Sequence, residues 1–142
     1  MIGSREGVFV VLGVLLIAGA AVLGLPVLAD EKPYQVVDGK VDKATFNGYR
    51  RFMDYCARCH GQYAVGSSFA PSLVDSLTHL SYEDFTNVVI NGRQNTTAGQ
   101  EKVMPAFGYV EDVASYIDDI YAYLKARSDG AIGVGRPKRV GE

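Results

Sequence analysis

Apolar residues recur at helical spacing in two well-separated parts of the chain. Within residues 44–56 they fall at offsets of 0, 3, 4 and 7, at Tyr49, Phe52, Met53 and Cys56. Within residues 111–127 a longer stripe has offsets of 0, 3, 4, 7, 10 and 11, at Val113, Tyr116, Ile117, Ile120, Tyr123 and Leu124. This is the spacing of one face of an α-helix, so both segments are predicted to be amphipathic helices.

A third helix is predicted over residues 81–91. It begins at Ser81 with acidic residues in its first turn and ends before Gly92, and its apolar side carries Phe85, Val88 and Val89. The segments 61–80 and 93–110 show no sustained period of 2 or 3.6 and are predicted to be long loops. Because no stretch alternates as a strand would, the sequence predicts an all-α fold.

The sequence predicts one folded domain with a short segment on either side of it. Residues 30–43 are polar with scattered apolar positions and are predicted to be an irregular N-terminal arm that precedes one folded domain over 44–127. Residues 128–142 are rich in glycine and predict a flexible basic tail, with its positive charge at Arg136, Lys138 and Arg139. A length of 142 residues without an internal repeat favours this single domain.

The first 29 residues have the pattern of an export signal. A short basic start at Arg5 is followed by an apolar run that glycines and Pro26 interrupt. Val27 and Ala29 provide small residues three and one positions before a cleavage point, so residues 1–29 are predicted to be a signal peptide removed before Asp30. The alternative is an uncleaved anchor, because a helix of roughly 20 apolar residues spans a bilayer core of about 30 Å.

Composition narrows the range of partners. The formal net charge is −2 and hydrophobic residues make up 48% of the chain. Neither value favours binding to nucleic acid or to an anionic membrane surface. Electrostatic recognition of a partner must therefore rest on local groups of charged residues.

The segment from Cys56 to His60, Cys-Ala-Arg-Cys-His, has the C-x-x-C-H pattern of covalent haem attachment. In this pattern the two thiols add to the haem vinyl groups and the histidine ligates the iron. Two residues between the cysteines at the end of a helix direct Cys56 and Cys59 toward one edge of the macrocycle, and His60 then reaches the iron. The sequence predicts one covalent haem c.

Other readings of two cysteines require a context that this sequence lacks. Two cysteines in an exported protein ordinarily suggest a disulfide. A redox-active thiol pair would need a βαβ unit, and a structural zinc site would need four ligands. The chain has only two cysteines and two histidines, and no second pair of ligands at the usual spacing. Haem attachment at Cys56 and Cys59 is the preferred interpretation.

An iron that only passes electrons needs a sixth ligand, because an open position binds oxygen, peroxide or nitric oxide. Met1 is removed with the predicted signal, and Met53 lies on the same helix as Cys56, too near to reach the opposite haem face. The remaining candidates are Met104, which lies 44 positions after His60 and precedes a proline, and His79, which precedes a helix start. Met104 is predicted to be the ligand and His79 a surface or capping residue. A thioether ligand raises the reduction potential.

Residues 44–127 resemble the class I cytochromes c, in which three to four helices wrap one covalent haem. Gly48 and Phe52 resemble the family's helix-crossing pair, which implies close approach of the C-terminal helix. Ala70-Pro71-Ser72-Leu73 resembles the loop whose proline carbonyl accepts the imidazole N–H, so Pro71 is implied to orient His60. The segment beginning at Met104 resembles the distal-ligand loop. The resemblance implies electron transfer without substrate turnover.

The partners implied by the resemblance are redox proteins. Lysines are few and scattered, and Trp is absent, so docking of the mitochondrial type is not expected. The C-terminal segment from Tyr123 to Pro137 is similar to that of small cytochromes that accept electrons from quinoprotein alcohol dehydrogenases, including methanol dehydrogenase. A periplasmic dehydrogenase is the expected donor, and an oxidase or another cytochrome the acceptor.

Three hypotheses follow. The chain is a diffusing periplasmic carrier whose iron is closed by His60 and Met104, an enzyme whose sixth position opens, or a haem subunit tethered to a respiratory complex by residues 1–29. The available Met104 favours the first over the second. Contact with a membrane is expected only if the N-terminal segment is retained.

Overall fold

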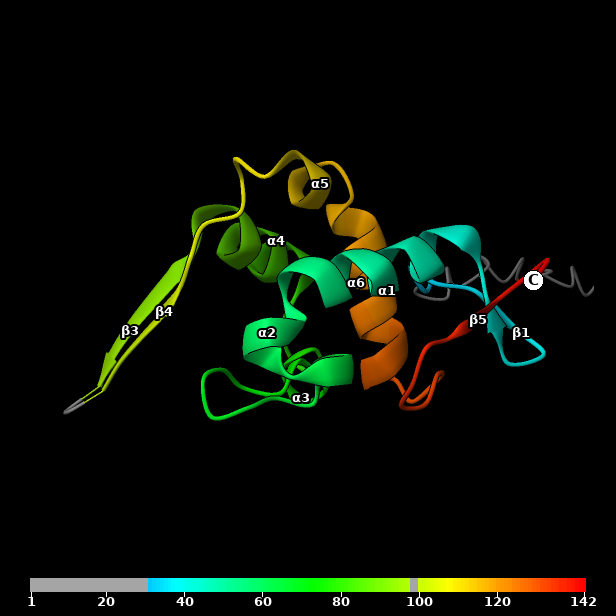
Figure 1. Cartoon of the computed structure of the whole chain (residues 1–142), viewed down its shortest axis with the longest axis horizontal. Coiled ribbons are helices and arrows are strands. Elements are labelled where there is room, and N and C mark those ends of the chain that lie inside the picture. The colour runs from blue at the N-terminus through cyan, green and yellow to red at the C-terminus, as the bar shows by residue number, and fades with distance from the viewer. Residues whose placement is uncertain (1–30, 98–99) are drawn as a thin grey trace, which may run out of the picture.

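The computed structural model describes residues 31–97 and 100–142, which form a helical body with short strands at its two ends (Figure 1). The helices are α1 (Lys43–Tyr55), α2 (Ala57–His60), the 3-10 helix η1 (Gln62–Ala64), α3 (Leu73–Ser76), α4 (Tyr82–Asn91), α5 (Glu111–Ala114) and α6 (Ile117–Ser128). The strands are β1 (Val36–Val37), β2 (Lys40–Val41), β3 (Arg93–Thr97), β4 (Gln100–Met104) and β5 (Lys138–Arg139). The predicted helical framework is confirmed, and the prediction of a signal peptide at residues 1–29 lies outside the described residues.

The last predicted helix is divided. A single helix was expected over residues 111–127, but α5 ends at Ala114 and α6 begins at Ile117. Tyr116 between them has φ −121° and ψ 26°, outside the helical range. The apolar stripe nevertheless continues across the break, because Val113 on α5 and Ile120 on α6 are both buried.

The start of α1 is fixed by Asp42. Its carboxylate accepts hydrogen bonds from the backbone N–H of Thr45 at 2.9 Å and from the Thr45 hydroxyl at 2.7 Å, and it also accepts from the backbone N–H of Gln35 at 2.8 Å. Asp42 thus caps the helix and ties it to the N-terminal arm. Partial burial alone would raise the pKa of Asp42, but these hydrogen bonds lower it below its ordinary value.

Replacement of Asp42 by alanine is expected to lower the free energy of unfolding by about 1 kcal/mol at neutral pH, because the cap is lost. Since the folded-state pKa is depressed, the contribution of the charge is present above the unfolded-state pKa and is lost as pH falls through the folded-state pKa. Guanidinium unfolding at several pH values measures both effects. Asp42→Asn keeps one acceptor for the Thr45 N–H but loses the second carboxylate oxygen and the charge, so its stability at neutral pH is expected to lie between those of the other two proteins, without the pH dependence. Equal stability of all three proteins at neutral pH would contradict the assignment.

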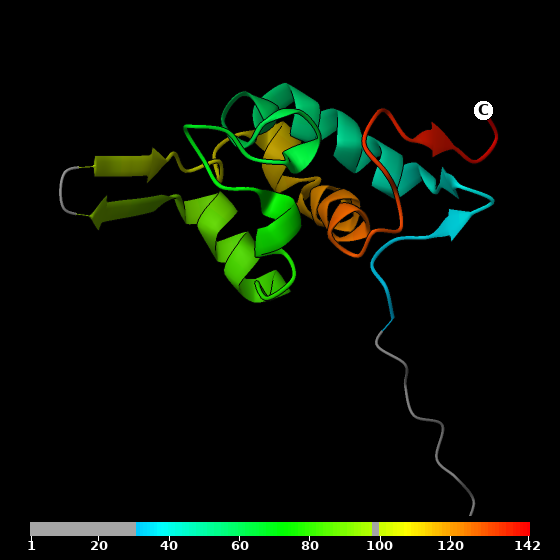
Figure 2. The same ribbon diagram turned by 90° about the horizontal axis from the view of Figure 1, so that it is seen from below.

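The core is centred on the crossing of α1 and α6, which Figure 2 shows from below. Phe52 on α1 and Ile120, Tyr123 and Leu124 on α6 are each at most 1% exposed. At the crossing, a Cβ on Gly48 would lie under 3.0 Å from backbone atoms of Asp119 and Ile120. The expected close approach at Gly48 is confirmed.

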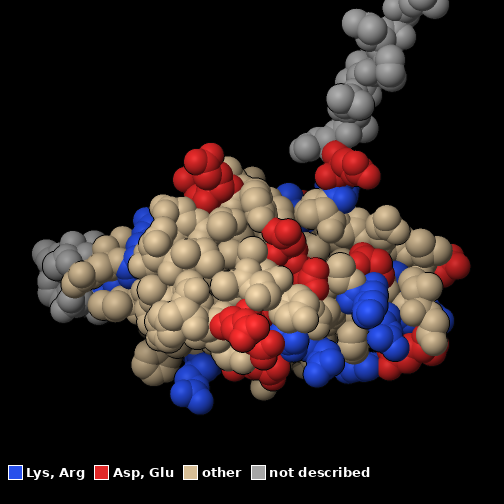
Figure 3. All heavy atoms as spheres, turned by 90° about the horizontal axis from the view of Figure 1, so that it is seen from above, with Lys and Arg blue, Asp and Glu red and all other residues tan. Residues whose placement is uncertain are grey.

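The arm and the tail are more ordered than the sequence indicates. The predicted irregular arm at 30–43 contains β1 and β2, which pair antiparallel, and β5 from the predicted flexible tail pairs with β2 in parallel. The tail is held further because the guanidinium groups of Arg136 and Arg139 lie 4.8 and 5.7 Å from the ring centroid of Phe46. Basic side chains gather toward this end of the molecule in Figure 3.

The segment 93–110 was predicted to be a loop, but its first part is a hairpin. Strands β3 and β4 pair antiparallel from Arg93 opposite Met104 to Thr97 opposite Gln100. The hairpin projects from the helical body in both ribbon views (Figures 1 and 2). No helix among residues 31–97 and 100–142 is long and apolar enough to span a bilayer.

Candidate functional site

The two cysteines and His60 are placed by the turn between α1 and α2. The backbone N–H of Cys56 donates to the carbonyl of Phe52 at 2.9 Å, and that of His60 donates to the carbonyl of Cys56 at 3.0 Å. Cys56 is partly buried, Cys59 is exposed and His60 is 7% exposed. Cys56, the residue that caps α2, and Cys59 within it thus both have free thiols, and the His60 side chain at the end of α2 is buried.

The imidazole of His60 is oriented by Pro71. Its Nδ1 lies 3.0 Å from the Pro71 carbonyl oxygen. A carbonyl can only accept, so Nδ1 is the donor in this contact and Nε2 is the nitrogen that could bind a metal. This is the arrangement by which a ligating histidine is usually held, with one nitrogen donating and the other free for a metal. The contact implied for Pro71 is therefore present.

The loop between His60 and Pro71 is tightly wound. The backbone N–H of Gly66 donates to the carbonyl of His60 at 2.7 Å, and the hydroxyl of Ser67 donates to the carbonyl of Cys59. Gly61 has φ +77°, and a Cβ there would come under 3.0 Å from the Gly66 backbone. A glycine is required at Gly61, because it has both a left-handed backbone and no room for a side chain.

Met104 comes from a different part of the chain. It ends β4, is half-buried and packs against the core cluster. The chain just after it is fixed to the end of α4, because the N–H of Phe107 donates to the carbonyl of Val89 at 2.9 Å and that of Gly108 to Ile90 at 3.1 Å. At the hairpin base, a Cβ on Gly92 would lie 2.7 Å from the Met104 carbonyl oxygen. The backbone from Met104 to Gly108 is thus held against the end of α4.

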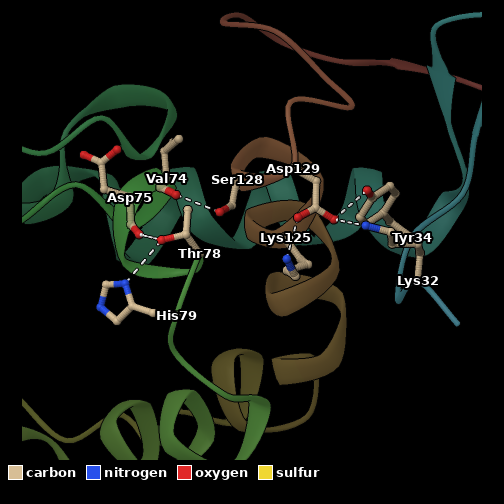
Figure 4. A network of polar contacts seen from close by, with 9 residues as sticks. All are labelled: Lys32, Tyr34, Val74, Asp75, Thr78, His79, Lys125, Ser128 and Asp129. Carbon is tan, nitrogen blue, oxygen red and sulfur yellow. Dashed lines mark hydrogen bonds and ion pairs between the residues drawn. The ribbon is translucent and has the colours of Figure 1, made fainter. Parts of the chain in front are cut away.

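His79, the other candidate for the sixth ligand, lies on the surface. It is exposed, and its Nδ1 is 3.2 Å from the hydroxyl of Thr78 (Figure 4). This agrees with its predicted place at the surface.

The donor set fits a covalently attached haem. Both cysteines are free of a disulfide, the imidazole has one nitrogen available, and a thioether is held on a separate segment. Burial raises the pKa of the Cys56 thiol to about 12, unlike the depressed pKa of a thiol-exchange cysteine. No group of three or more His, Cys, Asp or Glu side chains that could hold a metal ion occurs in the described part of the chain.

One buried residue beside the site was not singled out from the sequence. Arg127, near the end of α6, is only 7% exposed. A signal was present: Arg127 lies seven positions after Ile120 and so continues the apolar stripe of α6. Its guanidinium donates from Nε to the carbonyl of Tyr63 at 3.2 Å, in the loop that follows His60.

Comparison with known proteins gives a consistent family. Residues 44–124 match the family model described as cytochrome c oxidase, cbb3-type, subunit III. Cytochrome c-553I of Paracoccus denitrificans is 44% identical over 111 residues, which are 78% of this chain and 49% of that protein. Cytochrome c-555 of Methylococcus capsulatus is 41% identical over 96 residues, 67% of this chain and 72% of that protein. The chain spans about half the length of the Paracoccus relative.

A solved structure and an enzyme subunit extend the comparison. The crystal structure of c-type cytochrome XoxG from Methylobacterium extorquens AM1 matches with a TM-score of 0.66 and 38% identity, covering 78% of this chain and 74% of that chain. The dehydrogenase subunit of alcohol dehydrogenase (quinone) from Gluconacetobacter polyoxogenes is 36% identical over 88 residues, 61% of this chain and 11% of that protein.

Proposed function

Because the chain belongs to the c-type cytochromes, in the family described as cytochrome c oxidase, cbb3-type, subunit III, we propose that it is a monohaem one-electron carrier that works in the periplasm. The observation that carries the proposal is the local geometry at Cys56–His60, with two free thiols and an imidazole oriented by the Pro71 carbonyl at 3.0 Å. When bound, the haem supplies a reversible one-electron couple at its iron.

Each site residue has one task in this proposal. Cys56 and Cys59 would hold the group through thioether bonds, His60 would ligate the iron through Nε2, and Pro71 fixes the ring by accepting from Nδ1. Met104 would provide the sixth ligand from the end of β4, where its backbone lies close to Gly92. With His60 and Met104 both bound to the iron, the haem would exchange electrons without binding a substrate, so the proposed role is that of a carrier.

The proposed electron donor is a periplasmic quinoprotein alcohol dehydrogenase. This is supported by the similarity of 88 residues to part of a protein named as the dehydrogenase subunit of a quinone-linked alcohol dehydrogenase. The similar segment is 11% of that protein, so a module like this chain occurs within a quinone-linked alcohol dehydrogenase subunit. The acceptor is proposed to be an oxidase or another cytochrome.

Stopped-flow mixing of the purified oxidised protein with a quinoprotein alcohol dehydrogenase from the same cell, with alcohol present, tests the donor. We expect rapid haem reduction that slows as salt is raised, because docking charges are then screened. The control omits alcohol and should show no reduction. Reduction no faster than with a dehydrogenase of another cofactor class would contradict this donor and leave the carrier proposal standing.

A second candidate is a haem subunit tethered to a respiratory complex. It is favoured by one observation, the description of the matching family model as subunit III of an oxidase. In this case residues 1–29 stay attached as an anchor, whereas a freely diffusing carrier begins at Asp30. The mass of the N-terminal peptide of the purified protein separates the two.

A further inference from the structure

Arg127 carries a buried positive charge. Its side chain takes part in none of the ion pairs among residues 31–97 and 100–142. Its guanidinium donates instead to two backbone carbonyls, from Nε to Tyr63 at 3.2 Å and from Nη1 to Ile132 at 2.9 Å. Burial of a charge is costly when only carbonyl dipoles compensate it, so a function for this residue is expected.

The acid nearest to Arg127 along the chain is already engaged. Asp129 accepts hydrogen bonds from Lys32 at 2.6 Å and from the Tyr34 hydroxyl at 2.8 Å, and it also pairs with Lys125 (Figure 4). Burial opposes ionisation, but these partners hold the pKa of Asp129 far below its ordinary value. Asp129 therefore joins the N-terminal arm to the end of α6 and does not neutralise Arg127.

The end of α6 is held on its other side as well. The hydroxyl of Ser128 donates to the carbonyl of Val74 in α3 at 2.7 Å (Figure 4). Together with the contacts of Asp129, this bond fixes the last turn of α6, so the Arg127 backbone has little freedom to move away from its acceptors.

The carbonyl that Arg127 binds belongs to an unusual stretch of backbone. Tyr63 has φ 61° and Ala64 has φ 69°, so two successive residues with side chains are left-handed. This backbone conformation is disfavoured for a residue that carries a side chain. The hydrogen bond from Arg127 Nε holds the Tyr63 carbonyl in the orientation that this conformation requires.

This stretch lies between His60 and the group that orients it. Tyr63 is three residues after His60, and the loop closes where the Gly66 N–H donates to the His60 carbonyl at 2.7 Å. The Ser72 hydroxyl, next to Pro71, donates to the carbonyl of Ala64 at 3.4 Å. A change in the Tyr63–Ala64 conformation would therefore displace both the imidazole and its acceptor.

We propose that Arg127 is a positioning residue for His60 and that its buried charge raises the reduction potential of the iron that His60 would hold. The inference rests on the proposed haem site. Oxidation adds one positive charge at the iron, and a fixed cation in a low-dielectric surrounding disfavours that change.

The positive charge of Arg127 affects the pKa of the neighbouring Tyr123 hydroxyl. Burial raises the pKa of Tyr123 to about 12, and the positive charge of Arg127 opposes this rise. Arg127 also donates from Nε to the Tyr63 carbonyl, three residues after His60.

The test compares midpoint potentials of the holoprotein by spectroelectrochemistry. Arg127→Met removes the charge and both donors, and Arg127→Gln removes the charge but keeps one donor for the loop. Each is expected to lower the midpoint by at least the equivalent of a tenfold change in the Fe(II)/Fe(III) equilibrium, about 59 mV. Lys125→Gln is the matched control: it removes a charge from the same helix, but one that is 25% exposed and paired with Asp129. Its midpoint is expected to stay within a small fraction of that shift.

The outcomes separate the possible roles. A residue with only a structural role would lower thermal stability and leave the midpoint of the folded variants unchanged, which would overturn the inference. If Arg127→Met does not accumulate as holoprotein, Arg127→Gln alone decides, since it retains a hydrogen bond to the loop. Failure of the haem proposal itself would look different, because wild-type protein would then carry no covalent haem.

Discussion

Replacement of Met104 by alanine is expected to open the sixth position of the iron and to lower the midpoint potential by more than about 59 mV, a tenfold change in the equilibrium. The reason is that a thioether favours Fe(II), and alanine provides no donor. The variant should also bind added cyanide or carbon monoxide, which the wild type should resist. Spectroelectrochemistry and ligand titration of the reduced and oxidised forms measure these changes.

Met53 offers the matched control for this experiment. It lies on α1 and packs against the same core cluster, so Met53→Ala loses similar apolar contacts without removing the proposed ligand. Its midpoint and its resistance to added ligands should remain near those of the wild type. If Met104→Ala behaved like Met53→Ala, the ligand assignment would be wrong, and His79 would return as the candidate.

Replacement of Gly48 by alanine is expected to destabilise the fold by about 3 kcal/mol or more, near the upper end of overpacking effects. A Cβ at this position would lie under 3.0 Å from backbone atoms of Asp119 and Ile120, and a backbone cannot move aside as a flexible side chain can. Separation of α1 from α6 would loosen the whole core, because these helices make the principal packing contact. Guanidinium unfolding of the holoprotein measures the loss.

Gly133→Ala is the control for the crossing. Nothing lies within 4 Å of a Cβ built at Gly133, and its φ is not in the left-handed range, so the substitution should change stability by no more than a few tenths of a kcal/mol. Equal stability of Gly48→Ala and Gly133→Ala would show that α1 and α6 are farther apart than the structure places them.

The helices were predictable because their signal is local. The stripe on α1 and the acidic start of α4 depend on residues within two or three turns, and both helices occur within two residues of the expected bounds. No sequence signal near Tyr116 indicates the break between α5 and α6. Val113 and Ile120 keep the helical offset on either side of Tyr116, so the sequence reads as continuous where the backbone is not.

The strands were not predictable for a different reason. β1, β2 and β5 have two residues each, too few to show a period of 2, and β5 is joined to β2 from the far end of the chain. The β3–β4 hairpin is longer, but β3 reads Arg-Gln-Asn-Thr-Thr, which has no alternation of apolar and polar residues. A strand is recognised in a sequence by a period of 2, and these residues do not show one.

Some residues of the candidate site could be predicted from a local motif, whereas others depend on contacts that only the fold makes. Cys56, Cys59 and His60 form a contiguous motif whose chemistry is legible without a structure. Pro71 and Met104 depend on contacts made by folding, and their places came from family resemblance and from the shortage of other donors. Arg127 was missed because charge at a helix end usually means solvation, and only the packing of α6 against the loop at Tyr63 buries it.

The most direct test of the central claim is peptide mass spectrometry of the purified protein after proteolysis and treatment with a thiol-alkylating reagent. The account predicts one haem on the peptide that contains Cys56 and Cys59, with neither thiol alkylated. Two alkylated cysteines on a haem-free peptide would contradict covalent attachment, and with it the proposed electron-transfer function.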